Sequence, residues 1–417
     1  MDREGSLYES MSLSIAQARL IRSGVSAQFT EGGAGSEQNP STYRSRYAVQ
    51  VSNLRGFDVC KLGGGDKEIG LRTGIAMRSN LELEQNPLMK RLTKMAVRSL
   101  YTLGLASGEA ILSTYGERQY VVERVTPFSK LREPTLLKLY KQQYANLHNI
   151  LEQEEKKGIQ LMMGMDPEFL LVDASSMEVV PASQFLERIG EVGCDAVHMD
   201  GITSFPVAEL RPEPSLQPRG LLVELMHALG SAKQLIRDRS LIWMAGGMPV
   251  PGLPLGGHLH FSGIVLTYSL VQALDNYLAL PVMLLEDHTS LNRRPRYGYL
   301  GDFRRQPHGG FEYRTLPSFL VSPLVAKGVV FLAYLIVRHY KELVLRPLNQ
   351  EIIHRAYYEG NRNVIRGCIE PLFRDVMSLR GYSEYAKYID PLLDHISSGT
   401  IWDESRDIRP LWNIPVL

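Results

Sequence analysis

Hydrophobic and polar residues alternate along several short runs of this chain. The run from Tyr47 to Val51 has apolar residues at every second position, and the run from Ile159 to Met163 repeats the pattern. Successive residues of a strand point to opposite faces, so each run predicts a strand with one buried face. Two further runs, at 110–113 and 120–125, flank Tyr115-Gly116 and predict a hairpin.

Apolar residues at spacings of three and four predict helices between the strands. Asn86 and Pro87 are a typical helix cap and first-turn proline, and Gly104 marks the end of that helix. Pro281 predicts a kink in a later helix. The predicted helices cover residues 11–23, 86–104, 134–157, 221–236, 270–285 and 322–344.

The distribution of these segments predicts an α+β protein in which helices cover an antiparallel sheet. A Gly, Ser, Asn and Pro stretch at 31–41 indicates a flexible connection, and the segment from Gly201 to Pro206 is loop-like. We therefore expect an N-terminal appendage and linker at 1–42, a small α+β domain at 43–133, a helical connector at 134–158, a catalytic domain at 159–345, and a C-terminal helical region at 346–417 that packs on the catalytic domain.

Charge and composition exclude several classes of partner. Lysine and arginine number 46 against 45 acidic residues, so no overall charge attracts a nucleic acid or an anionic membrane. The start of the chain lacks the apolar core of a secretory signal, and no apolar run is long enough to cross a bilayer. We expect a soluble cytoplasmic protein whose three widely separated cysteines are reduced.

Polar side chains recur at alternate positions of four strand-like runs, where they would share one face. These side chains are Asp166 and Glu168, then Glu209, Arg211 and Glu213, then His258 and His260, and finally Glu312 and Arg314. Each pattern also has a simpler explanation, namely a solvent-facing strand, a surface charge ladder, or histidines satisfied in the core. Glycines on both sides of the histidine pair would let a bulky ligand approach the backbone.

Sites rich in oxygen with at most two imidazoles suit magnesium or manganese, whereas zinc prefers thiolates or three histidines. Magnesium in turn points to a nucleotide. A dense group of arginines between 293 and 305 favours capture of phosphate or carboxylate, although about half of them could pair with Glu286 or Asp302 instead. The common P-loop and dinucleotide motifs are absent from the sequence.

The four motifs, taken in order, resemble the glutamine synthetase and glutamate-cysteine ligase superfamily, and most closely its phage-type carboxylate-amine ligases, or amidoligases. The resemblance rests on Met165 to Phe169, Asp200 with the 209–214 segment, Gly257 to His260, and Glu312 to Arg314. It implies an antiparallel sheet that forms a glutamine-synthetase-like funnel, with ATP at one end and the acid substrate at the other. It further implies ATP-dependent amide formation through an acyl phosphate.

The resemblance also implies roles for individual residues. One divalent ion, Mg²⁺ or Mn²⁺, would be held by Glu168, Asp200 and Glu209, and a second by Asp166, His258 and Glu312. Arg314 would contact the transferring phosphoryl group, and Arg304 or Arg305 would neutralise it or bind the acid substrate. His260, Arg211 and Arg296 would lie near the nucleotide, and Glu213 would take a proton from the amine. The first acidic residue, Asp166, departs from the glutamate usual in the superfamily.

The expected partners are a small-molecule or peptide carboxylate and an amine. Two other functions stay open on the sequence. A metal-dependent hydrolase could use His258 and His260 with zinc, and it would recruit further ligands from His198, His288 or His308. A catalytically silent ATP- or metal-binding protein could keep the same sheet.

Overall fold

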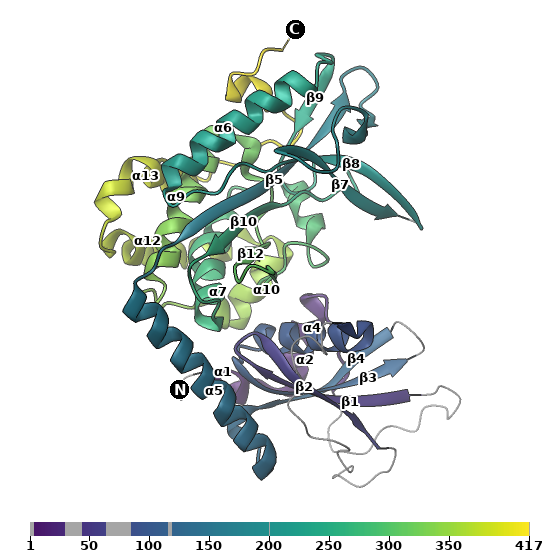
Figure 1. The fold of residues 1–417 in the computed structure, drawn as a ribbon, viewed down its shortest axis with the longest axis vertical. Coiled ribbons are helices and arrows are strands. Elements are labelled where there is room, and N and C mark those ends of the chain that lie inside the picture. The colour runs from purple at the N-terminus through teal and green to yellow at the C-terminus, as the bar shows by residue number, and fades with distance from the viewer. Residues whose placement is uncertain (1–3, 30–43, 64–84, 116–118, 200, 417) are drawn as a thin grey trace. The chain divides into compact units, whose positions relative to one another are not determined.

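The computed structural model describes residues 4–29, 44–63, 85–115, 119–199 and 201–416. The chain divides into two compact units, Met1–Lys157 and Gly158–Leu417 (Figure 1). The expected linker at 31–41 and Asp200 lie outside the described residues.

The first unit is built on a four-stranded antiparallel sheet of order β2-β1-β3-β4. Its strands are β1 (Arg44–Ser52), β2 (Arg55–Leu62), β3 (Ser107–Tyr115) and β4 (Gln119–Pro127), and its helices are α1 (Glu4–Ser10), α2 (Leu13–Arg22), α4 (Pro87–Thr102), η1 (Phe128–Lys130) and α5 (Pro134–Lys157). The alternation from Tyr47 to Val51 puts its apolar residues in the core beneath α2 and α4. The hairpin expected at 110–125 is the pair β3 and β4.

The packing of helices α2 and α5 was not evident from the sequence. Helix α2 contributes Ala16 and Leu20 to the core, so it is part of the unit rather than an appendage to it. Helix α5 packs on the opposite face of the sheet, where the Tyr140 hydroxyl donates to the Gly108 carbonyl at 2.6 Å. The Tyr140 ring meets Phe57 edge-on at 4.9 Å. The first half of the expected connector is thereby anchored to the sheet.

The second unit contains an eight-stranded antiparallel sheet whose main order is β11-β12-β10-β5-β8-β7, with β6 and β9 also paired to β5. These strands are β5 (Met162–Asp173), β6 (Val179–Val180), β7 (Val192–Met199), β8 (Ile202–Leu210), β9 (Leu241–Met244), β10 (Gly257–Ser262), β11 (Phe303–Arg305) and β12 (Phe311–Tyr313). The central strand β5 carries Phe169 toward Trp243, whose ring stacks on it at 4.8 Å. Antiparallel pairing and covering helices confirm the α+β class.

Strand β8 includes residues that the sequence suggested were a loop. The segment from Gly201 to Pro206 looked loop-like, but Ile202 and Thr203 pair with Met199 and His198 of β7. The ladder is interrupted between Asp195 and Val197, opposite Pro206. Proline has no N–H to donate, so it is tolerated beside such an irregularity.

Helices cover the sheet of the second unit (Figure 1). They are α6 (Pro218–Leu235), α7 (Tyr268–Leu274), α8 (Leu280–Val282), α9 (Pro323–His339), α10 (Glu351–Glu359), α11 (Arg362–Arg366), α12 (Ile369–Ser378) and α13 (Tyr382–Ser398), with short turns η2 (Ala182–Gln184), η4 (His288–Arg293), η5 (Phe319–Val321), η6 (Pro347–Asn349) and η7 (Arg409–Trp412). Helix α9 is buried along nearly its whole length. The expected kink at Pro281 takes the form of a π-helical turn, η3 (Asp275–Ala279), directly before it.

The three cysteines are free thiols, as expected. Among the described residues, no helix combines the length and apolar character needed to span a membrane.

Candidate functional site

Three neighbouring strands of the second unit place ionisable side chains on one face of the sheet. Asp166 on β5 lies directly opposite His258 on β10. His260, two residues along β10 and therefore on the same face, lies opposite Glu312 on β12. The strand register thus brings together four side chains that are far apart in the sequence.

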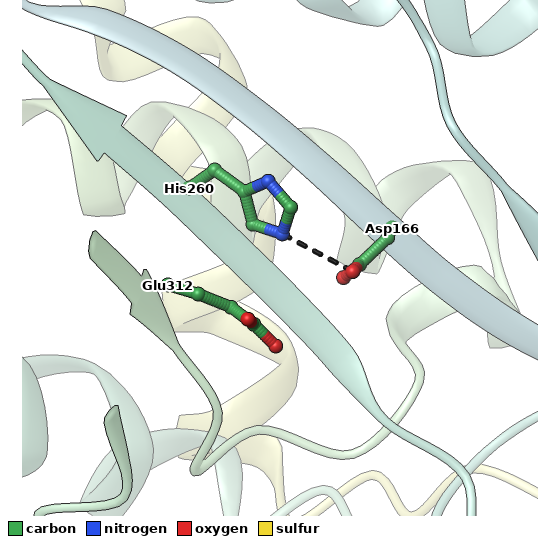
Figure 2. A group of neighbouring side chains, drawn as sticks. All are labelled: Asp166, His260 and Glu312. Atoms are coloured by element: carbon green, nitrogen blue, oxygen red, sulfur yellow. Dashed lines mark ion pairs between the residues drawn. The ribbon is translucent and has the colours of Figure 1, made fainter. Parts of the chain in front are cut away.

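The side chains of this cluster lie within reach of one another. His258 Nδ1 is 3.0 Å from Asp166 Oδ1 and 3.4 Å from Glu312 Oε1, and His260 Nε2 is 3.1 Å from Asp166 Oδ2. Figure 2 shows Asp166, His260 and Glu312 pointing toward one another from their separate strands, and ligand atoms of these three lie within 4.8 Å of one another. Carboxylate oxygens with one or two imidazoles are a donor set that suits Mg²⁺ or Mn²⁺.

Hydrogen bonding does not account for this proximity. Asp166 Oδ1, His258 Nδ1 and His260 Nε2 are buried and lie at ion-pair distance, but none of these atoms makes a well-aligned hydrogen bond. Buried polar atoms are nearly always hydrogen-bonded, so an unpaired and convergent group is the exception to explain. Atoms that converge on one point without bonding to each other are suited to share a cation.

The surroundings of His258 favour its positively charged form when no metal is bound. Burial would lower the pKa of His258, but the neighbouring Asp166 carboxylate outweighs it and raises that pKa. Burial would likewise raise the pKa of Asp166, yet the two histidines hold it below its ordinary value. The imidazolium of His258 therefore offsets the charge of the carboxylates, a task that a divalent ion could take over.

A second carboxylate pair lies on the same face, between β5 and β8. Glu168 is directly opposite Glu209, and both residues are 7% exposed. Burial raises the pKa of Glu168, and burial together with the Asp166 charge raises the pKa of Glu209 to about 9. Two buried carboxylates side by side repel when ionised, so they need a cation to be charged together.

Three of the predicted arginines have contrasting positions. Arg314 Nη1 lies 2.8 Å from Glu312 Oε1, and Arg304, which is opposite Glu312 in the ladder, reaches Glu312 Oε2 at 3.4 Å. The Arg304 side chain is 61% exposed, so its guanidinium can meet a ligand. Arg305 lies opposite Phe311 in the same ladder, so its side chain points to the other face of the sheet.

Three other predicted residues, Arg211, Glu213 and Arg296, lie outside the strands of the sheet. Strand β8 ends at Leu210, because the prolines at 212 and 214 lack the N–H that a ladder needs. Arg211 and Glu213 therefore do not continue the strand face: Arg211 pairs with Glu209 and donates to backbone carbonyls before β7, and Glu213 is exposed. Arg296 is exposed beside the Tyr297 ring.

Two arginines of the 293–305 group are structural. Arg293 donates to the Thr315 and Leu316 carbonyls, both at 2.8 Å. Arg294 pairs with Glu286 and lies over the Tyr357 ring at 4.3 Å. This matches the expectation that part of the group would be used internally.

Sequence reasoning missed two groups that contact the carboxylates. Gln306 Nε2 donates to Glu312 Oε2 at 3.1 Å, and the Gly256 backbone N–H donates to Glu168 Oε2 at 2.6 Å. The sequence pattern indicated that the glycines flanking the histidine pair, Gly256 among them, leave room for a ligand, but not that Gly256 donates to Glu168. A neutral amide after a short strand carries no recognisable motif, so Gln306 gave no signal.

The chain matches the family model described as "Phage phiEco32-like COOH.NH2 ligase-type 2" over residues 163–414. This match covers more than half of the chain and all of the described residues in the cluster. No curated protein matches the sequence.

Several solved structures are similar to this chain at low sequence identity. The bifunctional glutathione synthetase from Pasteurella multocida is 10% identical with a TM-score of 0.36, covering 64% of this chain and 51% of its own, so this chain spans about half its length. Plasmodium falciparum glutamine synthetase is 11% identical with a TM-score of 0.32, covering 90% and 97%. A GmaS/ADP complex is 12% identical with a TM-score of 0.27, covering 84% and 94%.

Proposed function

Because this chain belongs to the phage phiEco32-like COOH.NH2 ligase-type 2 family, we propose that it uses ATP to join a carboxylate to an amine through an acyl phosphate. Family membership makes it a carbon–nitrogen ligase. The substrates would be a small-molecule or peptide acid and an amine, and the enzyme would act in the cytoplasm, where ATP is available.

The observation that carries this proposal is the convergence of carboxylates and imidazoles on one sheet face. Asp166, His258 and Glu312 would hold one divalent ion, with His260 beside it. Glu168 and Glu209 would hold another, together with Asp200, which lies outside the described residues. When bound, Mg²⁺ or Mn²⁺ would screen the negative charge of the ATP phosphates.

The reaction consists of two displacements. A carboxylate oxygen of the acid attacks the γ-phosphorus of ATP, the bond to the β-phosphate oxygen breaks, and ADP leaves with that electron pair. The neutral amine then attacks the acyl carbon, and phosphate leaves. Loss of one amine proton to a base completes the amide, a role we assign to Glu213 or to water.

Arginines of the chain would stabilise the charge that moves in the first displacement. Arg314 is held in place by Glu312 at 2.8 Å and is only partly exposed, so it can offer its remaining N–H groups to the phosphoryl oxygens. Arg304 is more exposed and is suited to the acid substrate or the phosphoryl group. Arg211 pairs with Glu209, and its contact with the nucleotide stays a prediction.

Hydroxylamine tests the proposal without knowledge of the natural amine. It would intercept an acyl phosphate to give a coloured hydroxamate, so a panel of amino acids and short peptides can be screened with ATP and Mn²⁺. We expect a hydroxamate with at least one acid, and a loss of about 100-fold or more in Glu312→Gln. ATP-independent cleavage with zinc in the purified protein would favour the hydrolase instead.

A hydrolase has less support among the described residues. Two of its three candidate extra histidines contact residues outside the cluster: His198 contacts Thr203 at 2.8 Å, and His288 contacts Asp287 at 2.5 Å. The cluster contains two carboxylates and two imidazoles, and the neighbouring Glu168 and Glu209 add only carboxylates, so the donor set as a whole is rich in oxygen, as Mg²⁺ or Mn²⁺ prefers.

A further inference from the structure

Glu404, on the segment that follows α13, is a buried carboxylate with an unusual number of donors. It is 2% exposed, and its oxygens accept from the backbone N–H groups of Gly247 at 2.6 Å and Met248 at 2.8 Å. The hydroxyls of Thr289 and Ser290 and the indole of Trp402 also donate to it. Burying a carboxylate is costly unless it is fully hydrogen-bonded, and Glu404 meets that condition.

The backbone at 246–247 is shaped to admit this carboxylate. A Cβ atom on Gly246, whose φ is +121°, would lie 2.4 Å from Glu404 Cδ. A Cβ atom on Gly247 would lie 2.4 Å from the Ser290 hydroxyl oxygen. Only glycine fits at either position. Gly246 leaves room for the Glu404 carboxylate, and Gly247 leaves room for Ser290, which donates to it.

The same loop is bonded to Glu168 by two routes. In the first, Gly246 accepts from the Ser318 N–H at 2.9 Å, and the Ser318 hydroxyl donates to the Glu168 carbonyl at 2.5 Å. Ser318 is completely buried. This route fixes the backbone of β5 at Glu168.

The second route fixes the Glu168 side chain. The Gly247 carbonyl accepts from the Leu255 N–H at 2.8 Å, which closes the 247–255 loop. The next residue, Gly256, donates its N–H to Glu168 Oε2 at 2.6 Å and accepts from the Glu168 N–H at 3.0 Å. The 246–256 loop is therefore hydrogen-bonded to Glu404 near its start and to the Glu168 carboxylate at its end.

We propose that Glu404 is a positioning residue that holds the 246–256 loop, and through it the Glu168 carboxylate, in the geometry for cation binding. The inference rests on the proposed function insofar as Glu168 is a metal ligand. Groups that orient a ligand from behind typically change metal affinity by about 10- to 100-fold when removed.

Hydrogen–deuterium exchange of the full chain without metal tests whether Glu404 holds the 246–256 loop in place. Glu404→Gln keeps the shape but replaces one acceptor oxygen with an amide that faces N–H donors. We expect exchange at Met248, Gly256 and Glu168 to become about tenfold faster. Asp407→Asn is the matched control, because Asp407 anchors the same segment to the Trp243 N–H and to Arg409 instead. Equal exchange at these amides in both variants would overturn the proposal.

Manganese binding tests the consequence for the site. We expect Glu404→Gln to weaken Mn²⁺ binding about tenfold, while Asp407→Asn stays near the wild-type affinity. If Glu404→Gln binds Mn²⁺ as tightly as the wild type does, Glu404 is not a positioning residue. Absence of Mn²⁺ binding by the wild type would instead refute the proposed metal site. The exchange experiment would still test whether Glu404 holds the loop.

A milder variant covers the case in which Glu404→Gln does not fold. Ser318→Ala removes only the hydroxyl that reaches the Glu168 carbonyl and leaves the Ser318 N–H bonded to Gly246. We expect faster exchange at Glu168 and weaker Mn²⁺ binding in this variant. Wild-type behaviour in both measurements would show that the loop and Glu168 are not coupled.

Discussion

A Cβ atom on Gly256 would lie 2.2 Å from Nε2 of His258, so the histidine ring occupies the space that a side chain at 256 would need. The Gly256 N–H also holds Glu168 at 2.6 Å. Gly256 therefore contacts both parts of the site, the carboxylate–imidazole cluster through His258 and the Glu168–Glu209 pair through Glu168. The absence of a side chain at Gly256 therefore leaves the space that the His258 ring occupies.

Gly256→Ala should accordingly displace the His258 ring. We expect Mn²⁺ affinity to fall about tenfold or more, because a first ligand and the support of a second are both disturbed. Titration with Mn²⁺, followed by calorimetry or by the signal of the free ion, measures the change.

Gly230→Ala is the matched control for that variant. A Cβ at Gly230 meets nothing within 4 Å, and the residue lies inside helix α6. Alanine there should stabilise the fold by roughly 0.5–1 kcal/mol and leave Mn²⁺ binding unchanged. Equal Mn²⁺ affinity in the two variants would show that the space around His258 is not critical.

Arg304 and Arg305 provide an internal comparison, because adjacent strand residues point to opposite faces. Arg304 reaches Glu312, whereas Arg305 is paired with Phe311. We expect Arg304→Ala to lower hydroxamate formation about tenfold or more, and Arg305→Ala to stay near wild type. Steady-state rates at saturating ATP measure the difference. A larger loss in Arg305→Ala would place the acid substrate on the other face.

The metal-free protein should lose stability as the pH rises. Burial and the Asp166 charge raise the pKa of Glu209 from its ordinary 4.5 to about 9. Between these values the folded state keeps a proton that the unfolded state releases, so the free energy of unfolding falls with increasing pH. We expect the melting temperature of the chelator-treated protein to fall from pH 6 to pH 9, and to fall less in Glu209→Gln. Parallel curves for the two proteins would contradict the assignment.

Ser322 caps the buried helix α9 and should contribute to stability alone. Its hydroxyl accepts from the Val325 N–H at 3.2 Å. Ser322→Ala should cost about 1 kcal/mol and lower the melting temperature of the second unit by roughly 2–4 °C. Ser12→Ala removes the corresponding cap of α2 in the first unit, so calorimetry can assign each loss to its unit. A fall in activity at temperatures where Ser322→Ala stays folded would contradict a purely structural role.

The parts of the fold that follow from local patterns could be read from the sequence. Alternation along 159–163 predicted a strand that begins at Met162 in the structure, and Asn86 with Pro87 predicted the start of α4, because period and capping act over a few residues. Residues 201–206 were misread, since Pro206 suggests a loop unless the irregularity in its partner strand is known.

Parts of the site that depend on distant segments could not be read in this way. Asp166 and His258 each belong to a two-residue motif, and strand alternation placed both on one face. Glu404 carries no motif, and its five donors come from three separate stretches of chain. Which face Arg211 and Glu213 take depends on where β8 ends, and that end is set by prolines rather than by the charge pattern.

The π-helical turn η3 is hydrogen-bonded to β12, the strand that carries Glu312. Leu280 donates to the Asp275 carbonyl across this wider turn, and the Asp275 carboxylate accepts from the Tyr313 hydroxyl at 2.7 Å. Tyr313 is the neighbour of Glu312 and anchors the strand from behind. Chains that lose Pro281 should therefore also change Asp275 or Tyr313, so covariation among these three positions is expected across related ligases.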